Sequence, residues 1–188
     1  MPHADTRRGC GEDEFVEIRP YRPDDLHLAR AIDPSHTVDA IAILEVGPDS
    51  IGWSTIPSLP RQKSHDLAEY LEEPAPSWSE SYVAEVGGRI VGFAAVGFEP
   101  WNRRATLWHM YVDRPSRGTG VARALLSAIV ARAREQGSRQ VWLETQDSNI
   151  PAIAAYESLG FTIVGFDRSF YDNPPAAETA IFMSLDID

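Results

Sequence analysis

The sequence predicts an α/β (α+β) fold in which a mixed central sheet of six to seven strands is flanked by helices on both faces. Two strand-like segments, residues 81–86 and 89–98, are joined by Gly87-Gly88, which is typical of a two-residue hairpin turn. A long helical pattern follows between Gly118 and Gln136. The predicted order is an initial group of strands followed by strand–helix–strand–helix–strand–strand. This order favours helices packed against one sheet.

The first elements are bounded by prolines. Residues 15–18 predict a short strand that ends before Pro20. The segment Pro23-Asp24-Asp25 predicts the start of a helix whose last apolar position is Ile32, and Pro34 would stop it.

The next region is harder to interpret. Apolar stretches at 40–46 and 51–56, separated by the turn residues 47–50, predict a hairpin. Residues 57–79 hold four prolines, and we expect one short helix from Asp66 to Glu72 within them.

The second half alternates strands and helices. Residues 105–112 predict a strand, and the helix after it has an apolar row at Val121, Leu125, Ile129 and Ala133. Gly137 would end that helix. Residues 140–146 predict another strand.

The remaining elements close the fold. Asn149 or Ser148 caps a helix that has Pro151 in its first turn and stops at Gly160. Residues 161–166 and 179–185 predict the closing strands.

Composition limits the class of protein. The 188 residues fit one domain, at 14–188, after a polar tail at 1–13 that we expect to be disordered. No apolar run could span a bilayer, and the N-terminus does not resemble a signal peptide, so we expect a cytoplasmic protein. The net charge of -11 argues against nucleic acid or an anionic membrane as partner and suits a cationic substrate such as an amine.

Cysteine and metal chemistry are not indicated. The single cysteine, Cys10, cannot form an internal disulfide and lies in the polar tail, where a nucleophile would not be preorganised. We expect no metal, because the histidines lack ligand spacing and companion cysteines; they are His3, His27, His36, His65 and His109.

The junction from Val112 to Ala122 has the features of an anion site. A strand ends there, and a loop with Gly118 and Gly120 opens the long helix, whose first N–H groups have no intrahelical partner. The glycines leave the backbone accessible to a phosphate, and Arg117 adds a cation. The stretch is neither a P-loop nor a dinucleotide fingerprint, because Arg123 stands where the latter needs its third glycine.

The same stretch, V-D-R-P-S-R-G-T-G-V-A-R-A-L-L, resembles motif A of the GNAT acetyltransferases, whose core is Q/R-x-x-G-x-G/A. The resemblance implies the GNAT fold, acetyl-CoA as co-substrate, and backbone N–H groups that hold its pyrophosphate. The residues concerned are Arg117, Gly118, Thr119, Gly120, Val121 and Ala122.

A second stretch, W-L-E-T-Q-D-S-N-I-P-A-I-A-A-Y-E-S-L-G-F, resembles motif B of the same family. The resemblance implies that Asn149 contacts the pantetheine or the neighbouring backbone and that the Tyr156 hydroxyl points at the thioester sulfur. Tyr156 would then be the acid for the leaving thiolate in a direct transfer. A backbone N–H near Tyr111 or Val112 would stabilise the oxyanion.

Two residues compete for the role of general base. Glu144 lies in L-E-T, and a Glu in the similar L-E-V stretch of protein N-terminal acetyltransferases is proposed as base. His109 is the alternative, because an unperturbed histidine titrates near pH 6.5. A structural role remains open for both residues, and so does a water chain as base.

A narrower resemblance points to the streptothricin (nourseothricin) acetyltransferases, which acetylate a β-lysine amine of a cationic antibiotic. It rests on P-W-N-R-R, L-E-T-Q, D-P-S-H-T-V-D and the C-terminal G-F-D-R-S-F-Y-D and E-T-A-I-F-M-S-L. Acidic residues could bind such a polycation: Asp33, Asp39, Asp167, Asp172 and Glu178. The strand at 105–112 carries Trp108, His109 and Tyr111 where that family has acidic residues. Aromatic faces there and at Trp101 and Tyr171 could hold a cation instead.

Three functions therefore stay open. The first is acetylation of a primary amine of a small cationic molecule, with antibiotic resistance as its outcome. The second is acetylation of a protein or peptide, at an N-terminus or a lysine. The third is a non-catalytic acyl-CoA-binding regulatory module. A homodimer is compatible with the exposed strand edges of this fold.

Overall fold

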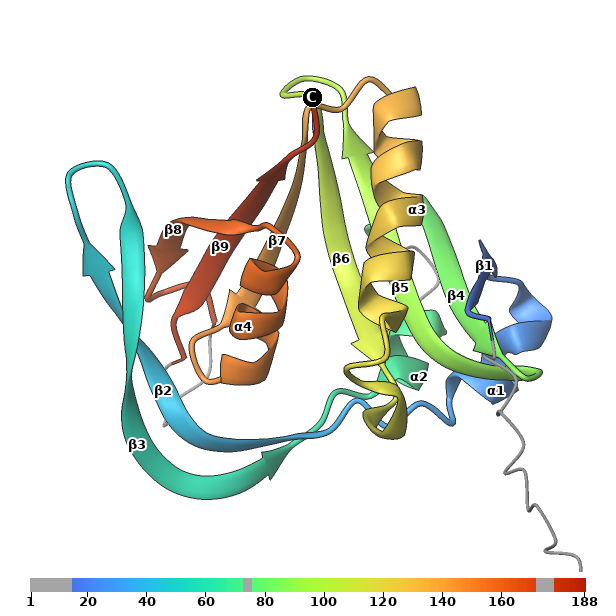
Figure 1. Ribbon diagram of the computed structural model, residues 1–188, viewed down its shortest axis with the longest axis horizontal. Coiled ribbons are helices and arrows are strands. Elements are labelled where there is room, and N and C mark those ends of the chain that lie inside the picture. Colours follow the sequence, from blue (N-terminus) through green and yellow to red (C-terminus); the bar gives the residue numbers. More distant parts are fainter. Residues whose placement is uncertain (1–14, 73–75, 172–177) are drawn as a thin grey trace, which may run out of the picture.

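A computed structural model describes residues 15–72, 76–171 and 178–188 (Figure 1). The predicted tail at 1–13 and Cys10 lie outside these residues, and the assignment of one domain to 14–188 stays a prediction. The main sheet has the strand order β1-β4-β5-β6-β7-β9-β8. Its strands are β1 (Glu17–Pro20), β4 (Glu80–Val86), β5 (Arg89–Glu99), β6 (Arg104–Val112), β7 (Gln140–Gln146), β8 (Thr162–Asp167) and β9 (Ala180–Asp186).

The predicted mixed sheet with helices on both faces is confirmed. Only β6 and β7 pair in parallel among the described strands, and β9 lies between β7 and β8. Helix α3 (Val121–Glu135) buries Val121, Leu125 and Ile129 against one face. On the other face, Phe93 of β5 packs in a second core cluster with Leu67 of α2 (Leu67–Leu71), beside α1 (Leu26–Ala29).

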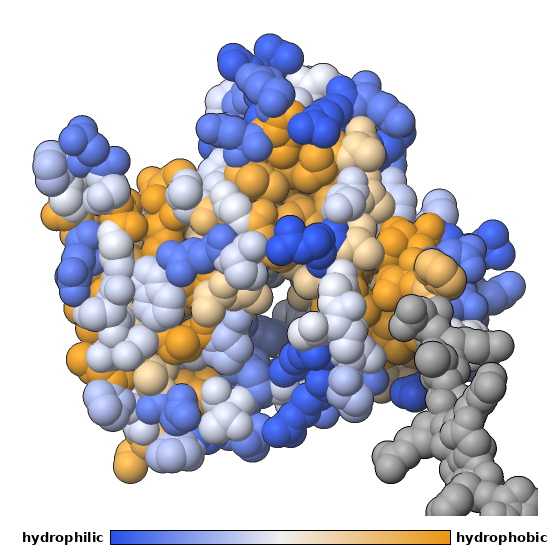
Figure 2. Space-filling view, in the orientation of Figure 1, coloured by the Kyte–Doolittle hydropathy of each residue, from blue (hydrophilic) through white to orange (hydrophobic). Residues whose placement is uncertain are grey.

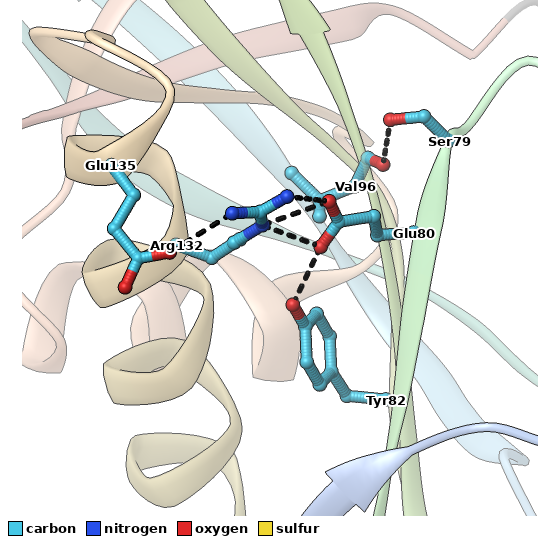
Figure 3. Close-up of polar contacts among 6 residues, drawn as sticks. All are labelled: Ser79, Glu80, Tyr82, Val96, Arg132 and Glu135. Carbon is cyan, nitrogen blue, oxygen red and sulfur yellow. Dashed lines mark hydrogen bonds and ion pairs between the residues drawn. The ribbon is translucent and has the colours of Figure 1, made fainter.

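An ion pair also fastens α3 to the sheet (Figure 3). The Arg132 guanidinium donates to both carboxylate oxygens of Glu80 on β4, at 2.7 to 2.9 Å, and to Glu135 one turn along α3. The Tyr82 hydroxyl donates to the same Glu80 carboxylate at 2.7 Å. This cluster lies at the C-terminal end of α3, away from the helix N-terminus.

The close approach of α3 to β5 depends on Gly92. A Cβ there would lie 2.8 Å from Val121 Cγ1 and 3.0 Å from Leu125 Cδ1. We expect Gly92→Ala to lower the free energy of unfolding by about 1–3 kcal/mol through overpacking. Gly52→Ala is the matched control, because a Cβ at Gly52 meets no atom within 4 Å. Urea unfolding would measure both variants, and equal stabilities would contradict this packing argument.

Several boundaries differ from those predicted. The helix expected from Pro23 to Ile32 is a 3-10 turn, η1 (Pro23–Asp25), followed by only four residues of α1. The long helix begins at Val121 rather than near Gly118, because the 3-10 turn η2 (Arg114–Ser116) and the glycine loop precede it. The short helix expected at 66–72 is confirmed as α2, with the Asp66 side chain as its N-cap.

The predicted hairpin is longer than its apolar stretches indicated. It consists of β2 (His36–Val46) and β3 (Ile51–Lys63), which form a separate two-stranded sheet. Pro57 and Pro60 lie within β3 rather than in a loop. This placement is tolerated because both strands of a two-stranded sheet are edges, where a missing N–H costs little.

The hairpin crosses from the N-terminal half to the C-terminal half of the molecule (Figure 1). It contacts α4 (Ile150–Ser158) and β8. Its polar anchors are the Trp53 indole, which donates to Glu157 at 2.9 Å, and Lys63, which pairs with Glu178 at 2.6 Å. Among the described residues, no helix is both long and apolar enough to cross a membrane.

Candidate active site

A cleft opens where β6 and β7 separate. The two strands pair only over residues 104–106 and 140–142. Beyond them, a cleft of about 660 Å³ is lined by residues 108–112 of β6 and residues 144–146 of β7. It lies between the two halves of the molecule, on the side of α3 and α4 shown in Figure 2. Within the described part of the chain, the edge of β6 that faces β7 has no strand partner beyond residue 106, so backbone N–H groups on that edge can face a ligand in the cleft.

β6 contains a β-bulge at Trp108, where the strand begins to line the cleft. Ala95 pairs with His109 and Val96 with Leu107, so Trp108 is an extra residue without a partner on β5. The Asp113 N–H donates to Val91 on β5, and strand alternation therefore directs the N–H and C=O of Val112 toward the cleft. Of the two residues expected to supply the oxyanion N–H, this register favours Val112 over Tyr111.

The glycine loop between η2 and α3 forms one end of the cleft. Gly118 and Gly120 have φ values of 78° and 93°, which disfavour any residue with a Cβ. A Cβ at either position would meet no protein atom within 4 Å. The helical hydrogen-bond pattern of α3 begins with the Ala124 N–H, which donates to the Gly120 carbonyl at 3.0 Å. The N–H groups before it, together with the open space beside the glycines, fit a phosphate group.

Arg117, predicted to add a cation beside the phosphate, also joins two loops of the cleft. Its guanidinium donates to the carbonyls of Val112, Ser35 and Asp33 at 2.9 to 3.3 Å. These contacts tie the loop before β2 to the loop before α3. The side chain therefore shapes the cleft through neutral carbonyl acceptors.

The loop geometry predicts a specific effect of Gly120→Ala. The substitution places a Cβ at φ 93° beside the cleft, and we expect acetyl-CoA affinity to fall at least tenfold. Gly137→Ala is the matched control, because Gly137 has φ 74° and equally open surroundings but lies beyond the C-terminal end of α3. Both variants should lose about 1 kcal/mol of stability. Titration calorimetry would contradict this role of Gly120 if both variants bound acetyl-CoA equally.

Helix α4 brings Asn149 and Tyr156 to the opposite wall. The Asn149 side chain accepts from the Ala152 N–H at 3.4 Å, which makes it the N-cap of α4. Tyr156 lies two turns further, edge-on to Phe161 with ring centroids 5.6 Å apart. Both residues line the cleft. Burial and the nearby Glu144 carboxylate raise the pKa of Tyr156, so its hydroxyl stays protonated at neutral pH.

Glu144 projects from β7 into the same cleft and accepts a hydrogen bond from the Tyr171 hydroxyl. Burial raises the pKa of Glu144 to about 7; Lys63 opposes this rise and Glu178 adds to it. Lys63 has a partner of its own, because it forms an ion pair with Glu178. A carboxyl group with a pKa near 7 is suited to accept a proton at neutral pH.

His109, the alternative base, is packed among aromatic rings. Its ring centroid lies 4.4 Å from that of Tyr70, 4.9 Å from Trp78 and 5.8 Å from Tyr111. Burial lowers the pKa of His109 to about 4, with a further contribution from His65. A group this weakly basic accepts protons poorly at neutral pH. The difference in pKa therefore favours Glu144 over His109 as the candidate base.

Sequence reasoning missed part of the cleft wall. His36, His65 and Tyr70 line the cleft, and the rings of His36 and His65 stack with centroids 6.4 Å apart. Burial lowers the pKa of both histidines. They come from the hairpin and from the segment before α2, and no local pattern connects those segments to the two motifs.

Three of the acidic residues expected to bind a polycation have hydrogen-bond partners within the protein, and Asp33 is one of them, since it accepts from the Ser35 N–H. Glu178 is bound by Lys63, Arg61 and Ser148, and Asp167 accepts from Ser169. Asp172 lies outside the described residues. Trp101 is 84% exposed and does not line the cleft, whereas Trp108 does.

The fold and the two motifs define an acetyltransferase site, and comparison with known proteins agrees. The acetyltransferase (GNAT) family matches residues 48–161. The chain belongs to this family and is an acetyl-CoA-dependent N-acetyltransferase that acts on an amine.

Its relatives include streptothricin and nourseothricin acetyltransferases. The streptothricin acetyltransferase of Streptomyces lavendulae is 32% identical over 179 residues, which are 90% of this chain and 94% of the relative. The crystal structure of nourseothricin acetyltransferase is 32% identical, with a TM-score of 0.76 over 92% of this chain and 99% of its own. A Bacillus anthracis str. Ames protein considered to be a streptothricin acetyltransferase, solved with acetyl coenzyme A, is 29% identical, with a TM-score of 0.81 over the same shares.

Proposed function

We propose that this enzyme acetylates a primary amine of a streptothricin-type cationic molecule, with Glu144 as general base and Tyr156 as general acid. The observation that carries the proposal is the meeting of these two side chains in one cleft that ends at the glycine loop of α3. The similarity to streptothricin and nourseothricin acetyltransferases over nine-tenths of the chain supports the choice of acceptor.

The cleft fits acetyl-CoA, which supplies an activated acetyl group. The amides from Arg117 to Ala122 would hold its pyrophosphate, because they surround the start of α3 and the space beside Gly118 and Gly120 is open. The Arg117 amide already donates to the Arg114 carbonyl at 3.4 Å, so the amides after it are the stronger donors for a phosphate. Asn149 would contact the pantetheine arm. The Val112 N–H would face the thioester carbonyl and stabilise the negative charge that develops on its oxygen.

The side chains then account for each proton. Glu144 takes one proton from the acceptor ammonium and releases it to solvent. The freed nitrogen lone pair forms the C–N bond while the C–S bond breaks, and Tyr156 gives its proton to the departing sulfur. The second nitrogen proton restores Tyr156. The products are an acetamide, the coenzyme A thiol and one proton.

Thiol release from acetyl-CoA in the presence of purified enzyme would test the proposal. The acceptors would be streptothricin, aminoglycosides, polyamines, free lysine and short peptides. We expect release with streptothricin. Release with peptides alone would favour a protein or peptide acetyltransferase, and tight binding of acetyl-CoA without release from any acceptor would favour a binding module.

The proposal also covers location and assembly. We expect the enzyme to act in the cytoplasm. The sheet ends at β1 and β8, and the β8 edge exposes Val164 and Phe166. Such an edge is compatible with pairing of two copies in a homodimer.

A further inference from the structure

Tyr171 is placed to act on the proposed base. It follows β8, and its hydroxyl donates to Oε1 of Glu144 on β7. The sequence suggested that its ring could hold a cation. In the structure its hydroxyl instead contacts Glu144, the one glutamate among the described residues that line the cleft. The partner is 27 positions away in the chain, so no motif connects the two residues.

A run of aromatic rings holds Tyr171 in this position. Phe170 packs edge-on against Tyr171 with centroids 5.2 Å apart, and against Phe182 at 5.7 Å. Phe182 stacks on Trp142 at 5.2 Å. Phe182 also pairs directly with Glu144 across β9 and β7, so both side chains lie on one face of the sheet. The rings therefore connect the backbone that carries Tyr171 to the strand that carries Glu144.

The other groups facing Glu144 come from three elements. Lys63 of β3 lowers its pKa, Glu178 before β9 raises it, and Tyr156 of α4 lies close enough for the Glu144 charge to act on it. Lys63 is engaged with Glu178, as described above. Tyr171 is thus the neighbour whose contact is a direct hydrogen bond to the Glu144 carboxylate.

We propose that Tyr171 is a positioning residue that fixes the Glu144 carboxylate and stabilises its ionised form, so that Glu144 can accept the proton of the acceptor ammonium. The proposal rests on the function proposed above. A hydroxyl that donates to a carboxylate favours the charged form and opposes the effect of burial. Burial acts in the opposite direction and favours the neutral acid.

Tyr171→Phe tests this role, because it removes the hydroxyl and keeps the ring that packs on Phe170. We expect the pKa of Glu144 to rise by about one unit. Since the base must be deprotonated, the acid limb of kcat/KM against pH should move to higher pH by the same amount. Activity should fall about tenfold on the acid limb and recover toward wild type near pH 9.

Tyr82→Phe is the matched control. It removes the same kind of contact, a tyrosine hydroxyl donating to a partly buried glutamate, but at Glu80 in the cluster with Arg132 (Figure 3). Its pH profile should coincide with that of wild type.

A second measurement is independent of turnover. Carbon-13 NMR of glutamate carboxyl groups, assigned with Glu144→Gln, reports the pKa of Glu144 directly, so it works even if no acceptor in the panel is acetylated. Parallel shifts of the NMR titration and the acid limb support the proposal. It is overturned if Tyr171→Phe moves neither, if it lowers the rate equally at all pH values, or if the NMR titration moves and the acid limb does not.

Discussion

Tyr156→Phe is expected to lower kcat about 100-fold while the affinity for acetyl-CoA stays within about threefold of wild type. The loss corresponds to removal of one positioned general acid. Tyr156 lines the cleft on α4, and burial followed by the Glu144 charge raises its pKa. It therefore holds its proton until the sulfur departs, and no limb of the pH profile near neutrality should belong to it.

Steady-state thiol release and calorimetry together would check this. Phenylalanine keeps the edge-on packing against Phe161, so the variant should fold with nearly unchanged stability. Unchanged kcat would show that Tyr156 does not protonate the leaving thiolate. A large loss of acetyl-CoA affinity would instead assign Tyr156 to binding.

The second half of the fold was predictable because its signals are local. Gly87-Gly88 fixes the turn between β4 and β5, and both glycines have positive φ values. The apolar row from Val121 to Ala133 defines the buried side of α3 within the helix itself. The two motifs likewise lie at consecutive strand-to-helix junctions, so each can be recognised from a few neighbouring residues.

Other features depend on contacts between distant segments. β9 enters between β7 and β8, where Glu144 meets Phe182, and no pattern in either strand specifies that neighbour. The hairpin reaches the C-terminal half through Lys63 and Glu178, which are 115 positions apart.

Local propensity also misleads at the N-terminus. Pro23 and the two aspartates after it start a helix, but α1 ends at Ala29, before Ile32 reaches the core beside Leu67. α1 packs against β5, and that contact is not encoded within the segment.

The shifted pKa of Glu144 is a further feature that could not be predicted from the sequence alone. Its motif indicated a base, but the rise of its pKa to about 7 comes from burial by residues of several elements.

We expect Glu144→Gln to lower kcat/KM about 100-fold at pH 7. The variant would depend on acceptor that is already neutral, and an alkyl amine with a pKa near 10 supplies about tenfold more of that form per pH unit. Its deficit should therefore shrink steadily toward pH 10.

A measurement of thermal stability distinguishes loss of the base in Glu144→Gln from misfolding of the variant. A carboxyl group whose pKa is raised on folding lowers stability as the pH rises from its unfolded value, near 4.5, to about 7. Glu144→Gln removes that penalty, so its melting temperature at pH 8 should equal or exceed that of wild type. His109→Gln should retain the acid limb, because His109 has a pKa of about 4 and is already neutral there. Loss of the acid limb in His109→Gln but not in Glu144→Gln would make His109 the base, and Tyr171 would then have no catalytic group to position.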